Sequence, residues 1–364
     1  MATAEPQPPV TATIVQRRDG RKAVEEFPDV SLELSRVWLP DRSRARVEAR
    51  RVTGAFAVEA SSGLAGVILE PPSIPGDRVT AKLAREADTG DEASTAGLYR
   101  AHVPLTYKPM LVEKVRTRRI REGNDLPNSV FAPDTRYIFQ DTAFPWCTTG
   151  RVDTSGGGCT GTMIGRRLMV TGSHCMQWTE TGAGWVKFTP SYYNGSTPFG
   201  VAWGTRVIYW SKADGSDGLS DQETAFDYVV IVLDRNMGDL TGYVGYRSYS
   251  DSWNGGKYWQ QIGYPGDLSG GQRPAFSGGG AITTAQQHTT SGQNGSVLGH
   301  FIDTSPGHSG GPYWGWWGNE PWPRLVGTDS TSPQKPSNDT SGDNEAGGGS
   351  ALSSLITYAR QKYP

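Results

Sequence analysis

Cysteine, net charge and long apolar runs are all scarce in this chain of 364 residues. Three cysteines are too few for a small scaffold built on disulfides, and a formal net charge of -2 attracts neither nucleic acid nor an acidic membrane surface. No run approaches the roughly 18 apolar residues of a membrane span, and the opening of the chain lacks the apolar core of a signal peptide. No His/Cys cluster has zinc spacing. We therefore expect no nucleic-acid or membrane partner, no metal and no cofactor, although scattered carboxylates leave calcium open.

The abundant residues indicate β-structure. The chain has 47 glycines, 12 tryptophans and 15 tyrosines, and short Val/Ile/Thr/Tyr runs alternate with turn residues. From residue 135 onward these runs predict an all-β fold, either a sandwich or paired barrels. The expected strands cover residues 137–139, 160–164, 168–171, 185–188, 205–210, 228–233, 258–263, 298–302 and 325–328. Apolar residues from Leu352 to Ala359 then recur at helical spacing behind Ser350, which predicts a C-terminal helix with Ser350 as its N-cap.

A change in composition divides the chain near residue 121. The chain of 364 residues is longer than the roughly 100–200 residues of a usual domain, which favours two units or one large unit with an extension. Residues 1–121 are rich in Arg, Glu, Val and Pro and contain no cysteine, so we expect an accessory region or pro-segment ahead of a catalytic domain at 122–364. The basic run at 116–121 is a candidate processing site, with a solvated charged turn as the alternative. We hypothesise that the pro-segment covers a cleft or assists folding.

A serine between glycines is the first candidate for chemistry. In the run 307–312, Gly-His-Ser-Gly-Gly-Pro, the glycines allow a sharp turn around Ser309 and bring backbone N–H groups close to a reacting carbonyl. The run also satisfies G-x-S-x-G, the nucleophile elbow of α/β-hydrolases. That elbow requires a histidine after the serine and a turn from strand to helix. No histidine follows His308, and Pro312 begins a turn into a strand, so the sequence disfavours this alternative.

The nucleophile needs a base within hydrogen-bond reach, and His174 is the best of five histidines. It follows a strand that ends in small residues, beside Cys175, and a bridge from Cys175 to Cys159 sixteen positions earlier would tether it. His308 is a poor base because neighbouring side chains diverge. Structural or solvated roles are expected for the remaining histidines, His102, His288 and His300.

Asp227 is the candidate for the carboxylate that orients the imidazole. It stands directly before the apolar run 228–233, which is typical of a core strand. A charge there is costly unless it is paired, and a triad carboxylate is paired with its histidine. The alternative is an aspartate that caps the strand by bonding its own backbone.

These motifs together resemble the chymotrypsin-like serine proteases, closest to the glutamyl-endopeptidase (V8-like) branch. The matching segments are 158–165, 171–175, the strand after Asp227 and 307–312, in the order His, Asp, Ser, and the turn at 264–267 also resembles one of that branch. The similarity extends from about residue 130 to the C-terminus. It implies two six-stranded antiparallel barrels with the triad in the cleft between them.

The resemblance also implies roles for single residues. It places a disulfide between Cys159 and Cys175 beside the histidine, which leaves Cys147 as a buried or incidental thiol. The backbone N–H groups of Gly307 and Ser309 would form the oxyanion hole.

The chain departs from the glutamate-specific members at the expected specificity pocket. Those members keep a histidine in the strand after the nucleophile, whereas this chain has Gly-Thr-Asp-Ser at 327–330, with Asp329 at that position. Asp303 occupies the place of the basic-residue selector of trypsin-like enzymes. Two carboxylates would favour Lys or Arg over Glu, although Asp303 and Thr304 are alternatively a structural pair. Ser330 resembles the serine that supports the triad aspartate.

The sequence thus predicts a secreted, monomeric serine endopeptidase, made as a zymogen, that hydrolyses polypeptides through an acyl-enzyme. Ser309 is the predicted nucleophile, His174 the general base and acid, and Asp227 the orienting carboxylate. The substrate-binding candidates are Asp303, Thr304, Asp329 and Ser330, with a basic residue slightly favoured over Glu before the scissile bond. The alternative is a protease-fold scaffold without catalysis, but its signature would be a broken triad, and this triad is complete.

Overall fold

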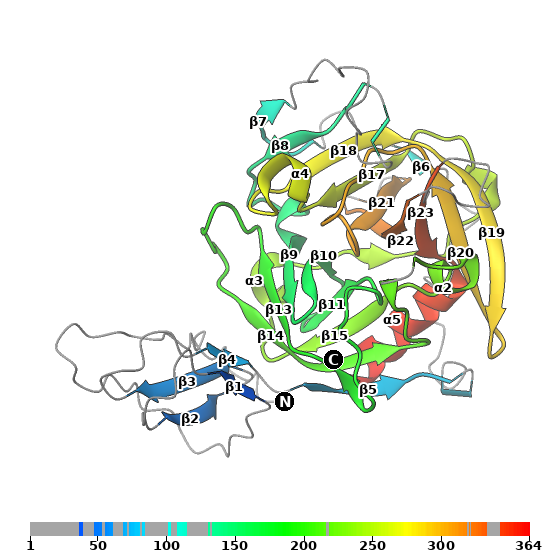
Figure 1. Ribbon diagram of the computed structural model, residues 1–364. Helices are drawn as coiled ribbons and strands as arrows, with labels where there is room; N and C mark the ends of the chain where they lie inside the picture. The colour runs from blue at the N-terminus through cyan, green and yellow to red at the C-terminus, as the bar shows by residue number, and fades with distance from the viewer. Residues whose placement is uncertain are drawn as a thin grey trace, which may run out of the picture.

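We describe the protein from a computed structural model (Figure 1). The structure describes residues 73–80, 82–83, 108–114, 130–131, 133–215, 218–318, 320, 322–332 and 343–364, together with the strands at 36–38, 47–52, 55–60, 68–70 and 101–102. The candidate processing site at 116–121, and with it the predicted domain boundary, lies outside the described residues. No helix in the described part of the chain combines the length and apolar character needed to cross a membrane.

Six antiparallel strands close a first barrel. They are β9 (Thr149–Thr154), β10 (Gly157–Met163), β11 (Leu168–Thr171), β13 (Val186–Pro190), β14 (Ala202–Tyr209) and β15 (Val229–Leu233). Their order is β14-β13-β9-β10-β11-β15, and β15 pairs back onto β14 to complete the circle. All five residues of β15 are buried, as its unbroken apolar sequence predicts.

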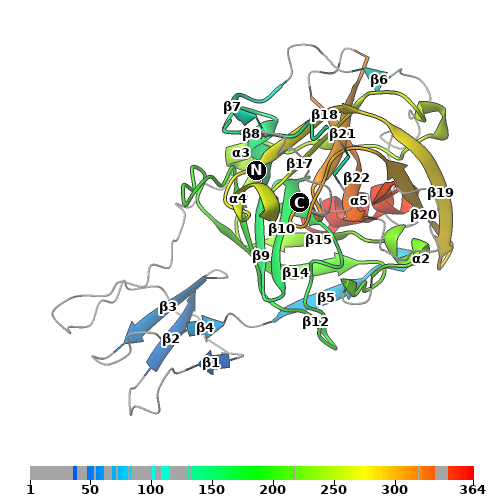
Figure 2. The ribbon, with the colours of Figure 1, turned by 45° about the horizontal axis from the view of Figure 1, so that its top comes forward.

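A second sheet curves beside the first barrel (Figures 1 and 2), and most of its strands follow that barrel in the chain. Its path is β19-β20-β23-β22-β21-β17-β18-β8-β7, with β16 paired to β22 and β6 to β21. The strands are β6 (Ala101–His102), β7 (Leu111–Lys114), β8 (Tyr137–Phe139), β16 (Gly245–Tyr246), β17 (Trp259–Gly263), β18 (Ala275–Gly280), β19 (Ile282–Thr290), β20 (Gln293–His300), β21 (Pro312–Trp317), β22 (Arg324–Thr331) and β23 (Asn344–Gly348). The all-β fold predicted from the sequence is confirmed.

The C-terminal helix α5 (Ser350–Lys362) packs against β20 and β15 and confirms the predicted helix. Its apolar positions from Leu352 to Ala359 are buried in the core that the two sheets share. The predicted N-cap is wrong. Gly349 occupies that position with φ of 86°, a value that favours glycine, and the Ser350 hydroxyl instead donates a hydrogen bond to the Asn294 carbonyl at 3.2 Å.

The remaining elements are short. The single-turn helices are α2 (Asp221–Thr224), α3 (Gly238–Thr241) and α4 (Gly266–Ser269), and the 3-10 turns are Trp146–Thr148 and Asp251–Trp253. Two separate two-stranded sheets are formed by β1 (Arg36–Trp38) with β4 (Ile68–Glu70) and by β2 (Val47–Val52) with β3 (Ala55–Ala60).

Three strands of the predicted accessory region pair with the two main sheets. Strand β5 (Ile74–Arg78) lies between β14 and the short β12 (Gly182–Ala183), and Figure 1 shows it in pale blue along the edge of the first barrel. Strands β6 and β7 pair with β21 and β8 of the second sheet. The region before residue 122 therefore contributes strands to both sheets.

Candidate active site

Buried Asp227 pairs with the partly exposed His174 at the end of the first barrel. Asp227 lies two residues before β15 and has no exposed surface. One carboxylate oxygen accepts a hydrogen bond from the His174 backbone N–H at 2.8 Å, and the other lies 2.5 Å from the His174 ring nitrogen Nδ1. The Ser330 hydroxyl donates to the same second oxygen at 2.5 Å. Three groups thus satisfy a carboxylate that the fold has removed from water.

Each partner of this pair favours the charged form of the other. Burial alone would raise the pKa of Asp227, but the positive charge of His174 and the hydrogen bonds from His174 and Ser330 hold that pKa below its usual value. Burial alone would lower the pKa of His174, but the charge of Asp227 and its hydrogen bond raise it instead. The pair is therefore suited to stabilising a protonated imidazole.

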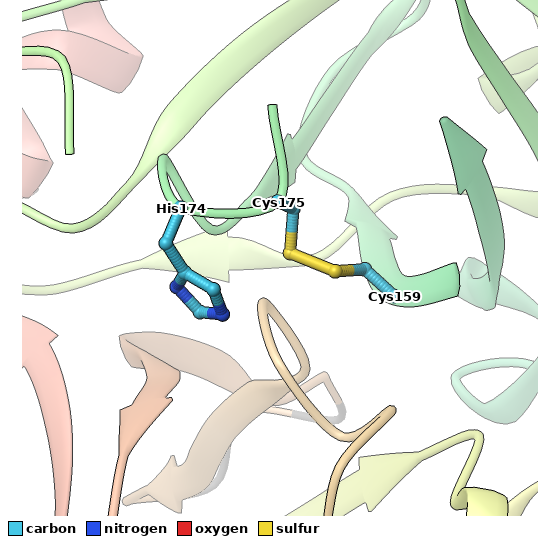
Figure 3. Close-up of side chains that lie close together, drawn as sticks. All are labelled: Cys159, His174 and Cys175. Atoms are coloured by element: carbon cyan, nitrogen blue, oxygen red, sulfur yellow. A yellow bond between two sulfur atoms is a disulfide. The ribbon is translucent and has the colours of Figure 1, made fainter. Parts of the chain in front are cut away.

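A disulfide holds the loop that carries His174. Cys159 lies on β10 and Cys175 follows the histidine, and the bridge between them spans 6.3 Å from Cα to Cα. Figure 3 shows His174 and Cys175 side by side on this loop, with the bridge leading away from the imidazole ring to Cys159. The two sulfurs and a histidine nitrogen lie within 4.8 Å of one another. Disulfide sulfurs are not thiolates, so these three residues do not offer a metal site.

Cys147 is an unreactive thiol. It is buried and unbridged, and its Sγ donates a hydrogen bond to the Thr241 carbonyl at 3.1 Å. Burial raises the pKa of the thiol to about 12, so the nucleophilic thiolate does not form near neutral pH.

Thr160 of β10 fixes the loop that carries Ser309. The Thr160 hydroxyl donates to the Gly307 carbonyl at 2.7 Å, and its backbone N–H donates to the Ser309 carbonyl at 2.9 Å. Gly307 has φ of 105°, and a Cβ there would clash with the Tyr264 carbonyl. Only glycine fits this position. The loop conformation therefore depends on Gly307 itself and on its contacts with Thr160 and Tyr264.

The residues after the serine are tied to strand β22. The Gly310 N–H donates to the Asp329 carbonyl at 2.7 Å, and the Asp329 N–H donates to the Gly311 carbonyl at 2.8 Å. Within the described part of the chain, no group accepts a hydrogen bond from the N–H of Gly307 or of Ser309. Both N–H groups therefore lack an acceptor among the described residues.

His308 is turned away from this chemistry. Its imidazole is fully buried, and its Nδ1 lies 3.0 Å from both the backbone nitrogen and the carbonyl oxygen of Ser305. Burial lowers the pKa of His308 to about 3, with the nearby Arg136 charge acting in the same direction. The ring is therefore neutral and structural.

A surface pocket joins the predicted catalytic and specificity residues. His174 and Ser309 both line it, together with Thr304, Asp329 and Ser330. Asp303 does not line it. Its carboxylate accepts hydrogen bonds from the Phe131 N–H at 2.8 Å and from the N–H and hydroxyl of Thr135 at 2.8 and 2.6 Å. Of the two aspartates proposed as selectors, the structure brings only Asp329 to the pocket.

Asp329 has an unusual environment for a surface pocket. It is 6% exposed, and the Tyr313 hydroxyl donates a hydrogen bond to its Oδ1 at 2.6 Å. Burial raises the pKa of Asp329 to about 7, and the negative charge of Asp227 adds to this, although the Tyr313 hydrogen bond and the His174 charge oppose it. The carboxyl therefore changes charge near neutral pH.

Sequence reasoning missed a buried arginine behind the serine loop. Arg136 is 2% exposed; its guanidinium donates to the Ser305 hydroxyl at 2.7 Å and pairs with Asp267 and Asp134, each at 2.8 Å. Ser305 in turn donates to Asp267 at 2.5 Å. The sequence contains one signal for this arginine, its position directly before the apolar strand β8. A cation next to a buried strand needs acidic or polar partners.

Comparison with known proteins agrees with the fold and with the resemblance that the sequence predicts. The chain is 33% identical to glutamyl endopeptidase of Bacillus licheniformis over 187 residues, covering 50% of this chain and 54% of that protein. It is 28% identical to a protein named extracellular metalloprotease of Bacillus subtilis over 153 residues, covering 40% and 47%. The chain spans about half the length of these curated relatives. No protein-family model matches it.

The solved structure of a Glu endopeptidase in complex with MPD has the same fold. Its TM-score is 0.50 at 22% sequence identity, over 64% of this chain and 99% of that one. The architecture is thus that of the chymotrypsin-like serine proteases. The sequence similarity to glutamyl endopeptidase confirms the predicted resemblance to the glutamyl-endopeptidase branch.

Proposed function

We propose that this protein is a serine endopeptidase that hydrolyses peptide bonds through an acyl-enzyme. The observation that carries the proposal is the pairing of buried Asp227 with His174, which lines the same pocket as Ser309. His174 takes the proton from the Ser309 hydroxyl as its oxygen attacks the carbonyl carbon. The N–H groups of Gly307 and Ser309 stabilise the oxyanion. His174 then gives its proton to the leaving amine, and water hydrolyses the ester.

The pocket supports a refined proposal for the residue before the scissile bond. Asp303 is engaged by Phe131 and Thr135, so Asp329 is the carboxylate that meets the substrate. When ionised it attracts Lys or Arg and repels Glu. A second candidate, glutamate preference, is favoured by the relative named glutamyl endopeptidase and by the raised pKa of Asp329, because a protonated Asp329 can donate a hydrogen bond to a Glu carboxylate.

The biological setting is part of the same proposal. Secretion is supported by the disulfide and by the relative whose name states that it is extracellular. We propose a monomer that is made as a zymogen and acts on polypeptides. The name metalloprotease belongs to that relative. For this chain we propose a serine mechanism, with Ser309 as nucleophile, His174 as base and the N–H groups of Gly307 and Ser309 as oxyanion donors.

Digestion of an unfolded protein tests the activity. The wild-type protein, after any processing it requires, should cleave reduced and alkylated casein, and the Ser309→Ala variant should lose at least about a thousandfold in rate. A chelator should leave the wild-type rate unchanged. Equal digestion by the wild type and Ser309→Ala would refute the serine mechanism, and an inactive, folded wild type would favour the scaffold alternative.

A further inference from the structure

Strand β5 pairs with the part of β14 that β13 leaves uncovered. The first residues of β14 pair with β13, but its last residues extend beyond that partner. There β5 adds as a parallel strand, with Val207 to Tyr209 paired to Gly76 to Arg78. Backbone hydrogen bonds continue the pairing, from the Val79 N–H to the Tyr209 carbonyl at 2.8 Å and from the Gly76 N–H to the Thr181 carbonyl at 2.9 Å. The segment thus satisfies backbone groups that would otherwise form an open edge.

The two apolar side chains of this segment reach different cores. Ile74, 5% exposed, packs into the core of the first barrel. Val79, 2% exposed, belongs to the core that the two sheets share with α5. Removal of the segment would therefore uncover apolar surface in both cores, and apolar burial is the main favourable term in association.

Close packing and charge add to this contact. A Cβ on Gly182 of β12 would clash with the Ile74 carbonyl, so this glycine allows β5 to approach. Asp77 pairs with Arg206 of β14 at 2.9 Å and with Lys362 of α5 at 3.0 Å, and it accepts a hydrogen bond from the Tyr363 hydroxyl at 2.6 Å. The segment thereby connects the barrel edge to the C-terminus of the helix.

The same segment stays away from the catalytic pocket. Among the described residues, none that precedes residue 122 lines the pocket of His174 and Ser309. The described contacts of residues 73–80 are therefore those of a structural strand and not of an inhibitor lying in the cleft.

We infer that residues 73–80 are a permanent strand of the protease, which stays bound to the first barrel after the chain is cut downstream. The mature monomer then consists of two polypeptide fragments that come from the same chain. The barrel edge formed by β14 and β12 is the interaction surface, and the partner is the protein's own N-terminal segment. This inference rests on the proposed processing of the chain but not on its proposed activity, because its test measures mass.

Controlled cleavage tests the inference on the full chain. Sites for a sequence-specific protease are inserted after Gly90 and after Gly123, so that the fragment with β5 is severed from the one with β6 and β7. After cleavage and gel filtration under native conditions, mass spectrometry should find fragment 1–90 in nearly equimolar amount with the fragment that begins at Asn124. Recovery of less than a tenth of fragment 1–90 would overturn the inference, whatever the state of the remainder.

A matched pair of glycine variants tests the contact itself. Gly182→Ala places a methyl group against Ile74 and should raise the dissociation constant of fragment 1–90 at least tenfold. Gly158→Ala lies on β10 of the same barrel, where an added Cβ meets nothing within 4 Å, and should leave it unchanged. Circular dichroism of the uncut variants verifies their folding. If Gly182→Ala retained the fragment as well as the wild type, β5 would not be the segment that holds it.

Discussion

Raising the pH through neutrality should change the side chain that the pocket prefers before the scissile bond. Asp329 is nearly buried at the pocket, and its pKa is raised to about 7. Because an acid with a raised pKa is neutral below that value, Asp329 is a hydrogen-bond donor for Glu at acid pH. Above it, the ionised carboxylate attracts Arg. Tyr313, His174 and Asp227 are the groups that act on it, and their effects are included in this pKa.

The size of the change follows from the titration. With a pKa of about 7, the ionised fraction of Asp329 rises from about a tenth at about pH 6 to about nine tenths at about pH 8. The kcat/KM for an Arg substrate should follow the ionised fraction and that for a Glu substrate the protonated fraction, about tenfold each. Their ratio therefore rises about a hundredfold. Two charges about 4 Å apart interact by about 4 kcal/mol at an effective dielectric constant of about 20, which exceeds the roughly 1.4 kcal/mol per tenfold that this requires.

The assay compares two fluorogenic peptides that differ only in Arg or Glu before the scissile bond. Both substrates require the same base, so the titration of His174 cancels in the ratio of their kcat/KM values. Asp329→Asn removes the titrating group and keeps the shape, and its ratio should not vary with pH. A constant wild-type ratio between about pH 6 and about pH 8, or an equal rise in Asp329→Asn, would refute the assignment of Asp329.

Two other substitutions test the support behind the triad. Ser330→Ala removes one of three hydrogen bonds to buried Asp227 and should lower kcat/KM about tenfold, since a hydrogen bond to a charged group contributes about 1.5–3 kcal/mol. A loss of less than about twofold in steady-state kinetics would show that Ser330 does not support the triad. Arg136→Met removes a buried guanidinium from Asp134 and Asp267, whose side chains are 10% and 26% exposed, and should lower the free energy of unfolding in urea by about 2 kcal/mol. Arg166→Ala, at a far more exposed ion pair, should lower the free energy of unfolding much less, and equal losses would contradict the role of burial.

The elements that the sequence predicts well carry strong local signals. Strand β15 is an unbroken apolar run, and β11 was predicted at the bounds the structure has. Strand β19 was missed because most of its side chains are exposed, so its Thr- and Gln-rich sequence shows no apolar face. Strand β5 was missed because Ile-Pro-Gly-Asp-Arg has the composition of a turn, and its partner β14 lies far away in sequence.

The candidate site divides in the same way. Ser309, His174 and Asp227 each stand in a short motif, so their identities could be read from the chain. The orientation of a side chain depends instead on distant partners. Asp303 stands at the position of a selector, yet its carboxylate is directed to Thr135, more than a hundred residues earlier. Neither this contact nor the role of Thr160 in fixing the serine loop has a local signal.

Labelling with a fluorophosphonate probe tests the central claim most directly, because the probe reacts with a serine that a neighbouring base activates. The account predicts stoichiometric labelling of the wild-type protein, with the adduct mass on the peptide that contains Ser309. Ser309→Ala should not be labelled, and His174→Ala should be labelled far more slowly. A folded, processed wild-type protein that remains unlabelled, or an adduct on another residue, would contradict the account.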